Sequence, residues 1–96
     1  MIVLNVAYKC KPGMREAFLT KIREEGLDAK SRGEAGNSKY DYYFAADDGD
    51  ELLLVEKRQD ADTLAKHGKE PHFARLGEIK EEYVAETIIE KYEAKE

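Results

Sequence analysis

The chain of 96 residues has no tryptophan, a single cysteine and no apolar run long enough to cross a bilayer. One cysteine excludes an intrachain disulfide, and the position of Cys10 at the end of an apolar segment favours a small buried residue over a nucleophile. The start of the sequence has no basic region followed by a small-residue cleavage site. We therefore expect an unprocessed, soluble protein of the reducing cytoplasm.

A block of charge of one sign is also missing. Charged residues make up 39% of the chain and the net charge is −5, but acidic and basic side chains alternate along the whole length. This balance argues against a nucleic-acid or anionic-membrane partner. The length fits one domain, residues 1–96, with a modest core.

The hydrophobic pattern predicts four strands. Apolar, β-branched or aromatic residues dominate segments 2–10, 40–46, 51–58 and 84–92. The acidic turn at 47–50 makes a hairpin of the two central segments.

Helical spacing of apolar residues fills the intervals between these strands. One amphipathic helix should begin at Pro12 and weaken beyond Gly26, a short one should follow Asp60, and a longer one should open at Pro71. The order βαββαβ predicts a ferredoxin-like α+β fold, in which a four-stranded antiparallel sheet carries its helices on one face.

The third expected strand contains four successive apolar residues, 52–55. Side chains alternate between the two faces of a strand, so both faces of this strand should be buried. One layer of helices covers only one face of a sheet. A second copy of the chain is the simplest cover for the other, and we expect a homodimer.

Two opposite charges, Glu56 and Arg58, continue that strand and share one of its faces with Leu52 and Leu54. Two interpretations remain open. The strand has reached the rim of the sheet, where the charges pair weakly in water, or the two side chains border a cavity.

Two histidines follow, His67 and His72, separated by a glycine and a proline. A spacing of five does not place both rings on one helical face, so a protein-bound metal is not expected. His72 falls in the first turn of a helix, where the positive end of the helix dipole favours the neutral imidazole that acts as a base. The alternative for both is a helix-end histidine bonded to the backbone.

Aromatic residues concentrate in the second expected strand, where Tyr40, Tyr42 and Phe44 share a face. Cross-strand packing explains most of them, although at least one phenol is expected to line a pocket. Asn37, after Gly36, is most simply a turn residue.

Three segments together resemble the antibiotic biosynthesis monooxygenase domain over nearly the whole chain. They are Gly36-Asn37-x-x-Tyr40-Asp41, Val55-Glu56-x-Arg58-x-Asp60 and Leu64-x-x-His67-x-x-x-Pro71-His72-Phe73. The resemblance implies a dimeric α+β barrel in which two four-stranded sheets close face to face. It also implies a small-molecule site between helices and sheet. Relatives include quinol and anthrone monooxygenases that need no cofactor, haem-degrading enzymes and a sugar-phosphate isomerase.

The haem-degrading branch is disfavoured by three departures. Its asparagine, tryptophan and late-helix histidine correspond here to Val6, Arg58 and Gly77. Many monooxygenase-like members also carry tryptophan where Arg58 stands.

The leading interpretation is a cofactor-independent monooxygenase of a small quinol, anthrone or phenol. By resemblance, His72 or His67 takes a proton from the substrate and Glu56 orients the base or Arg58. Substrate contacts are expected from Asn37, Tyr40, Arg58 and Phe73.

Two alternatives remain. An isomerase or proton-transfer enzyme of a small carbonyl compound would use the same base, and Arg58 would suit a phosphate or carboxylate on its substrate. A non-catalytic ligand-binding dimer would have the pocket without turnover.

Overall fold

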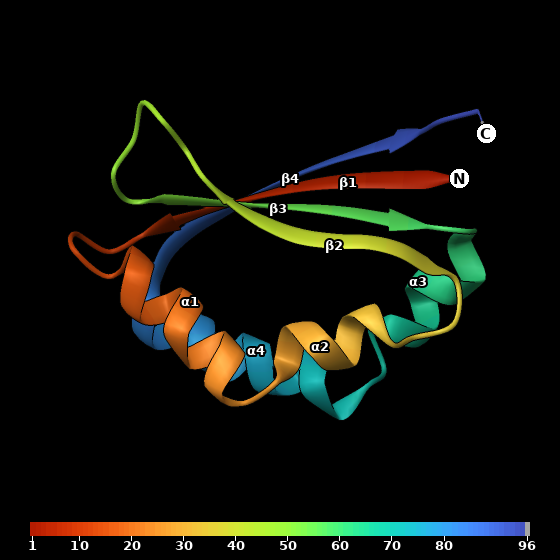
Figure 1. The fold of residues 1–96 in the computed structure, drawn as a ribbon, viewed down its shortest axis with the longest axis horizontal. Coiled ribbons are helices and arrows are strands. Elements are labelled where there is room, and N and C mark those ends of the chain that lie inside the picture. Colours follow the sequence, from red (N-terminus) through yellow and green to blue (C-terminus); the bar gives the residue numbers. More distant parts are fainter. Residues whose placement is uncertain (96) are drawn as a thin grey trace.

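A computed structural model describes residues 1–95 and shows one sheet covered by helices on one face (Figure 1). In chain order the elements are β1 (Ile2–Cys10), α1 (Arg15–Glu24), α2 (Leu27–Arg32), β2 (Asn37–Phe44), β3 (Glu51–Arg58), α3 (Ala61–His67), α4 (Pro71–Tyr83) and β4 (Val84–Glu93). The predicted ferredoxin-like βαββαβ arrangement is confirmed.

The four strands pair antiparallel in the order β2-β3-β1-β4. The most apolar strands, β1 and β3, lie in the centre, where both edges are hydrogen-bonded and neither meets water. In the register of this pair Leu4 lies opposite Glu56, and Ile2 lies opposite Arg58. The charged end of β3 is therefore flanked by an apolar end of β1.

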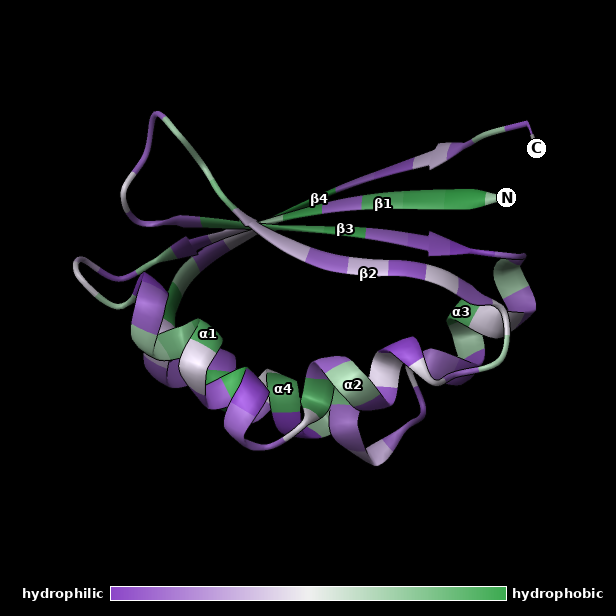
Figure 2. Ribbon diagram, in the orientation of Figure 1, coloured by the Kyte–Doolittle hydropathy of each residue, from purple (hydrophilic) through white to green (hydrophobic). Residues whose placement is uncertain are grey.

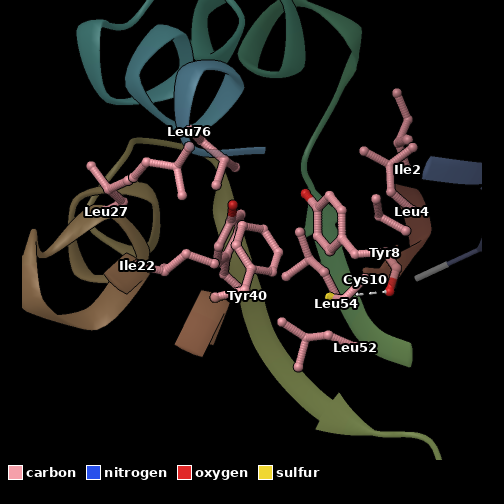
Figure 3. Close-up of a cluster of buried hydrophobic side chains, with 13 residues drawn as sticks. Ile2, Leu4, Tyr8, Cys10, Ile22, Leu27, Tyr40, Leu52, Leu54 and Leu76 are labelled. Atoms are coloured by element: carbon pink, nitrogen blue, oxygen red, sulfur yellow. Dashed lines mark hydrogen bonds between the residues drawn. The ribbon is translucent and has the colours of Figure 1, made fainter. Parts of the chain in front are cut away.

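Strict alternation in β1 and β3 sends every second side chain toward the helices. The hydropathy colouring shows much of β1 in green, in the sheet that lies above the helices in this view (Figure 2). Side chains of the helices, among them Ile22, Leu27 and Leu76, meet those of Tyr40 and Leu54 in the core (Figure 3). Cys10 is buried at the end of this layer, and burial raises the pKa of its thiol.

The opposite face of the sheet carries no second layer within residues 1–95, as Figure 1 shows. Leu53 and Val55 of β3 point to this side and are only half-buried. Tyr43, Ile88 and Tyr92 are more than two-fifths exposed. Residues 1–95 thus bury one face of β3 beneath the helices and leave its other face without a covering layer.

Several element boundaries differ from the sequence prediction, and β2 ends at Phe44 rather than at residue 46. Pro12 lies in a turn ahead of α1, which begins only after Met14. The expected weak continuation is a separate helix, α2, because Gly26 adopts a left-handed conformation with φ of 66° between the two. β2 begins at Asn37, three residues earlier than expected, so Asn37 is a strand residue.

No helix among the described residues is both long and apolar enough to cross a membrane.

Candidate functional site

A cavity of about 530 Å³ opens between the helix layer and the helix-facing side of the sheet. Its lining is mostly apolar, which suits the body of a small organic ligand. The lining residues come from β1, β2, β3, α3, α4 and β4 and are Leu4, Val6, Tyr8, Tyr40, Leu54, Glu56, Leu64, His67, Gly68, Phe73, Leu76, Gly77, Lys80, Thr87, Ile89 and Lys91.

His67 is the imidazole of this cavity. It is the last residue of α3, and its backbone carbonyl accepts the amide of Glu70 in the turn toward α4. Its Nδ1 lies 2.9 and 2.8 Å from the two carboxylate oxygens of Glu34, and the ring of Phe73 packs edge-on at 5.1 Å. The side chain is therefore held in one orientation, with Nε2 free of hydrogen bonds to the described residues.

Glu34, in the loop before β2, is the centre of a charged cluster. It also accepts hydrogen bonds from Nε2 of His72 and, at 2.7 Å, from Nη1 of Arg58. Burial by itself would raise the pKa of the Glu34 carboxyl, but the bonds from His67, His72 and Arg58 outweigh it and hold that pKa below its usual range. Glu34 is thus a carboxylate at neutral pH.

Arg58 is completely buried between two carboxylates. Its Nε donates to Glu56 at 2.5 Å, Nη1 donates to Glu34, and Nη2 has no partner among the described residues. Glu56 is only 3% exposed. The rim interpretation is wrong, because both side chains are buried and the loop that carries Glu34 packs against this end of β3.

Four of the seven residues expected at the site line the cavity: His67, Glu56, Tyr40 and Phe73. The other three do not. His72 and Arg58 stand behind the cavity wall, where both contact Glu34.

Asn37 does not line the cavity, although its backbone amide donates to the carbonyl of Glu34. Its side-chain amide donates to the carbonyl of Lys39 at 3.2 Å. Gly36 before it has φ of 84°, and a Cβ there would come within 2.4 Å of Cγ2 of Thr63. The chain can pass this close to α3 only with glycine.

Two phenols complete the polar part of the cavity. Tyr8 and Tyr40 are both buried, and burial raises the pKa of each hydroxyl above its usual value, with the nearby charge of Glu56 adding to the effect. Both therefore stay neutral and are available as hydrogen-bond donors to a bound oxyanion.

The two histidines converge, contrary to the expectation from their spacing. That expectation considered a single helix, whereas the turn between α3 and α4 brings both rings to one carboxylate. Ligand atoms of Glu34, His67 and His72 lie within 4.8 Å of one another, so these three could hold a metal ion. The Arg58 guanidinium on the same carboxylate opposes an added cation there.

Three residues of the site were not selected from the sequence. Glu34 stands between Gly33 and Gly36 in a loop, and only its place directly before the Asn37 motif marks it. Tyr8 follows Leu4 and Val6 on one strand face, and Lys80 lies four residues after Leu76 on the inner stripe of α4. Strand and helix periodicity therefore held a signal for the last two.

Known proteins resemble this chain in sequence and in structure. Residues 1–78 match the family model described as antibiotic biosynthesis monooxygenase. A Bacillus subtilis (strain 168) protein, named "Putative monooxygenase YcnE", is 34% identical over 73 residues, which are 76% of this chain and 75% of that protein.

Solved structures agree over almost the full length. The protein PA3566 from Pseudomonas aeruginosa superposes with a TM-score of 0.87 at 26% identity, covering 99% of this chain and 94% of its own. A conserved protein from Bacteroides thetaiotaomicron gives a TM-score of 0.82 at 34% identity, covering 95% and 94%. By its sequence match and its fold, the chain belongs to the antibiotic biosynthesis monooxygenase family.

Proposed function

We propose that the protein is a cofactor-independent monooxygenase of a small quinol, anthrone or phenolic compound, with His67 as the base. The observation that carries the proposal is the pairing of Nδ1 of His67 with Glu34 while the same ring lines the cavity. A carboxylate beside Nδ1 keeps the proton on that nitrogen, so that Nε2 carries the lone pair and can accept a proton.

The reaction begins with loss of the substrate's hydroxyl proton to Nε2 of His67. Glu34 stabilises the imidazolium that forms, as the orienting carboxylate does in other histidine-dependent enzymes. Glu34 also borders a second hollow of about 150 Å³ on the far side of His67, which offers the proton a way to water. Glu56 holds Arg58, and Arg58 in turn fixes Glu34.

The resulting anion is electron-rich and lies in an apolar cavity. The neutral phenols of Tyr8 and Tyr40 donate hydrogen bonds to it. The anion then reacts with molecular oxygen. One oxygen atom is incorporated into the product, the other is reduced to water, and all the electrons come from the substrate. The apolar walls exclude bulk water from this step.

Oxygen uptake by the purified protein with a panel of quinols and anthrones tests the proposal. We expect His67→Ala to lower the rate about 10²- to 10⁴-fold, the usual contribution of a general base. His72→Ala should cost less, because His72 contacts Glu34 and not the cavity. Lys69→Met, an exposed neighbour outside the site, is the matched control. Full activity in His67→Ala would end the assignment of the base.

An isomerase of a small carbonyl compound would use the same His67–Glu34 pair, and the Lys80 ammonium in the cavity favours an anionic substrate of that kind. The two chemistries differ in their need for oxygen. Turnover that continues under anaerobic conditions supports the isomerase and contradicts the monooxygenase.

We further propose that the active form is a homodimer closed through the uncovered face of the sheet. That face presents Leu53, Tyr43 and Ile88 to water, which is unusual for a monomer. Strand register places Lys57 of the central strand β3 and Glu90 of the edge strand β4 on this same face. A two-fold axis would bring these opposite charges of two copies together.

A further inference from the structure

The charged side chains that line the cavity differ in whether a partner or water compensates their charge. Glu56 is bonded to Arg58, and His67 is bonded to Glu34. Lys91, at the β4 edge, is exposed to water. Lys80 differs from all three, because it is half-buried and no carboxylate of the described residues lies within 4.0 Å of its ammonium group.

Lys80 faces the interior of the cavity from α4. It is one helical turn beyond the buried Leu76, and its Nζ lies 5.4 Å from the ring centre of Tyr8, a residue of the cavity floor. Burial lowers the pKa of this ammonium, with no opposing contribution from an acid. Within residues 1–95 this partly desolvated ammonium group faces an aromatic ring and forms no hydrogen bond or ion pair, so it lacks the partner that such groups normally have.

We propose that Lys80 binds an anionic group of the ligand, so that the cavity takes a flat aromatic acid with its hydroxyl at His67 and its carboxylate at Lys80. This inference rests on the proposed function for the role of His67. It replaces Arg58 as the anion contact, since Arg58 is fully buried and already paired with Glu34 and Glu56. The mostly apolar lining suits an aromatic body that carries a single carboxylate.

The length of the ligand follows from the helix. Phe73 packs on His67, and Lys80 comes seven residues later, which is about 10 Å along the axis at 1.5 Å per residue. Side chains of one helix lean in the same direction, so this axial separation applies to both ends of the ligand site. A hydrogen bond of about 2.9 Å at each end takes up part of this gap, so a phenol and a carboxylate carried on one ring or on two fused rings fit it.

Calorimetric titration under anaerobic conditions tests the proposal with 6-hydroxy-2-naphthoate and its uncharged methyl ester. The wild-type protein should bind the acid about tenfold more tightly than the ester, which is the contribution of one charge-assisted hydrogen bond. Lys80→Met keeps most of the apolar stem and should remove this preference. Lys80→Arg should retain it, and Lys69→Met, which changes the net charge equally on the exposed surface, should leave it unchanged. Thermal unfolding of each variant confirms that it is folded.

Two results would overturn the inference: an undiminished preference for the acid in Lys80→Met, or no binding of the acid to the wild-type protein. The proposed function is tested separately by oxygen uptake. Lys80-dependent binding of the acid without oxygen uptake from any quinol would refute the monooxygenase and leave the anion site standing. Oxygen uptake from uncharged quinols only, with no dependence on Lys80, would refute the anion site and support the monooxygenase.

Discussion

From the buried ion cluster we predict that Arg58→Met will lower the free energy of unfolding far more than a typical substitution does. Arg58 is 0% exposed and Glu56 is 3% exposed, and the two lie 2.5 Å apart. Removing the guanidinium leaves the Glu56 carboxylate buried without a partner, while Glu34 retains two histidines. Breaking such a buried pair costs about 3 to 5 kcal/mol of folding free energy. For a domain of this size the melting temperature should fall by on the order of 20 °C.

Urea denaturation followed by far-ultraviolet circular dichroism measures the loss. It should be repeated at several protein concentrations, because association shifts apparent stability. The decisive control is the double variant Glu56→Leu with Arg58→Met, in which both charges are replaced by apolar side chains. It should recover most of the loss, since a buried pair exchanged for apolar groups is often neutral. A loss below about 1 kcal/mol in Arg58→Met, or a double variant no better than the single one, would refute the reasoning.

Four further outcomes follow from the same structure. The pKa of Glu34 in the folded protein is below its usual value, so Glu34 stabilises the fold fully above the ordinary glutamate range and loses this contribution as pH falls through the folded pKa. Glu34→Gln should therefore make the unfolding midpoint depend less on pH between pH 5 and pH 3, and an unchanged pH dependence would contradict this. Gly36→Ala should cost about 2 kcal/mol or more, whereas Gly13→Ala, with a φ of 75° but no atom within 4 Å, should cost only the backbone strain of about 1 kcal/mol in the same urea assay. Ile88→Lys should shift the protein to monomers in sedimentation equilibrium, and an unshifted mass would exclude the dimer through this face. Exhaustive chelation should leave oxygen uptake unchanged, and a rate restored only by an added divalent ion would instead assign a metal to the carboxylate and two imidazoles.

Most of the fold could be predicted because strand alternation and helix-end residues are local features of the sequence. Alternation in β1 and β3 reports directly on which side chains are buried, and the capping Asp60 and the Pro71 at the start of α4 mark helix ends through backbone hydrogen bonds within a few residues. The boundary errors came from weaker signals. Pro12 fits a helix start and a turn equally well, and β2 begins among polar residues whose strand conformation is set by pairing with β3.

The candidate site was predicted less well, because its geometry depends on contacts far apart in sequence. His67 and Glu34 are 33 residues apart and His72 and Glu34 are 38 apart, so no spacing rule indicates that they meet. Tyr40 was found because strand alternation marks its face, and Phe73 because it belongs to a segment that resembles the family. Arg58 was placed on the correct face of β3 but at the wrong depth, since burial at the end of a strand depends on what packs over it.

By itself, the sequence determined the order of elements, the inward faces of the strands and the family, because hydrophobic period, turn residues and short motifs act over a few residues. Only the tertiary structure decided that Glu34 joins both histidines, that Arg58 is enclosed and that Lys80 faces the cavity without an acid. These features arise where the loop before β2, the turn between α3 and α4, and the inner stripe of α4 pack onto the sheet. Their charges then acquire partners, or remain without them, according to distances that no local pattern encodes.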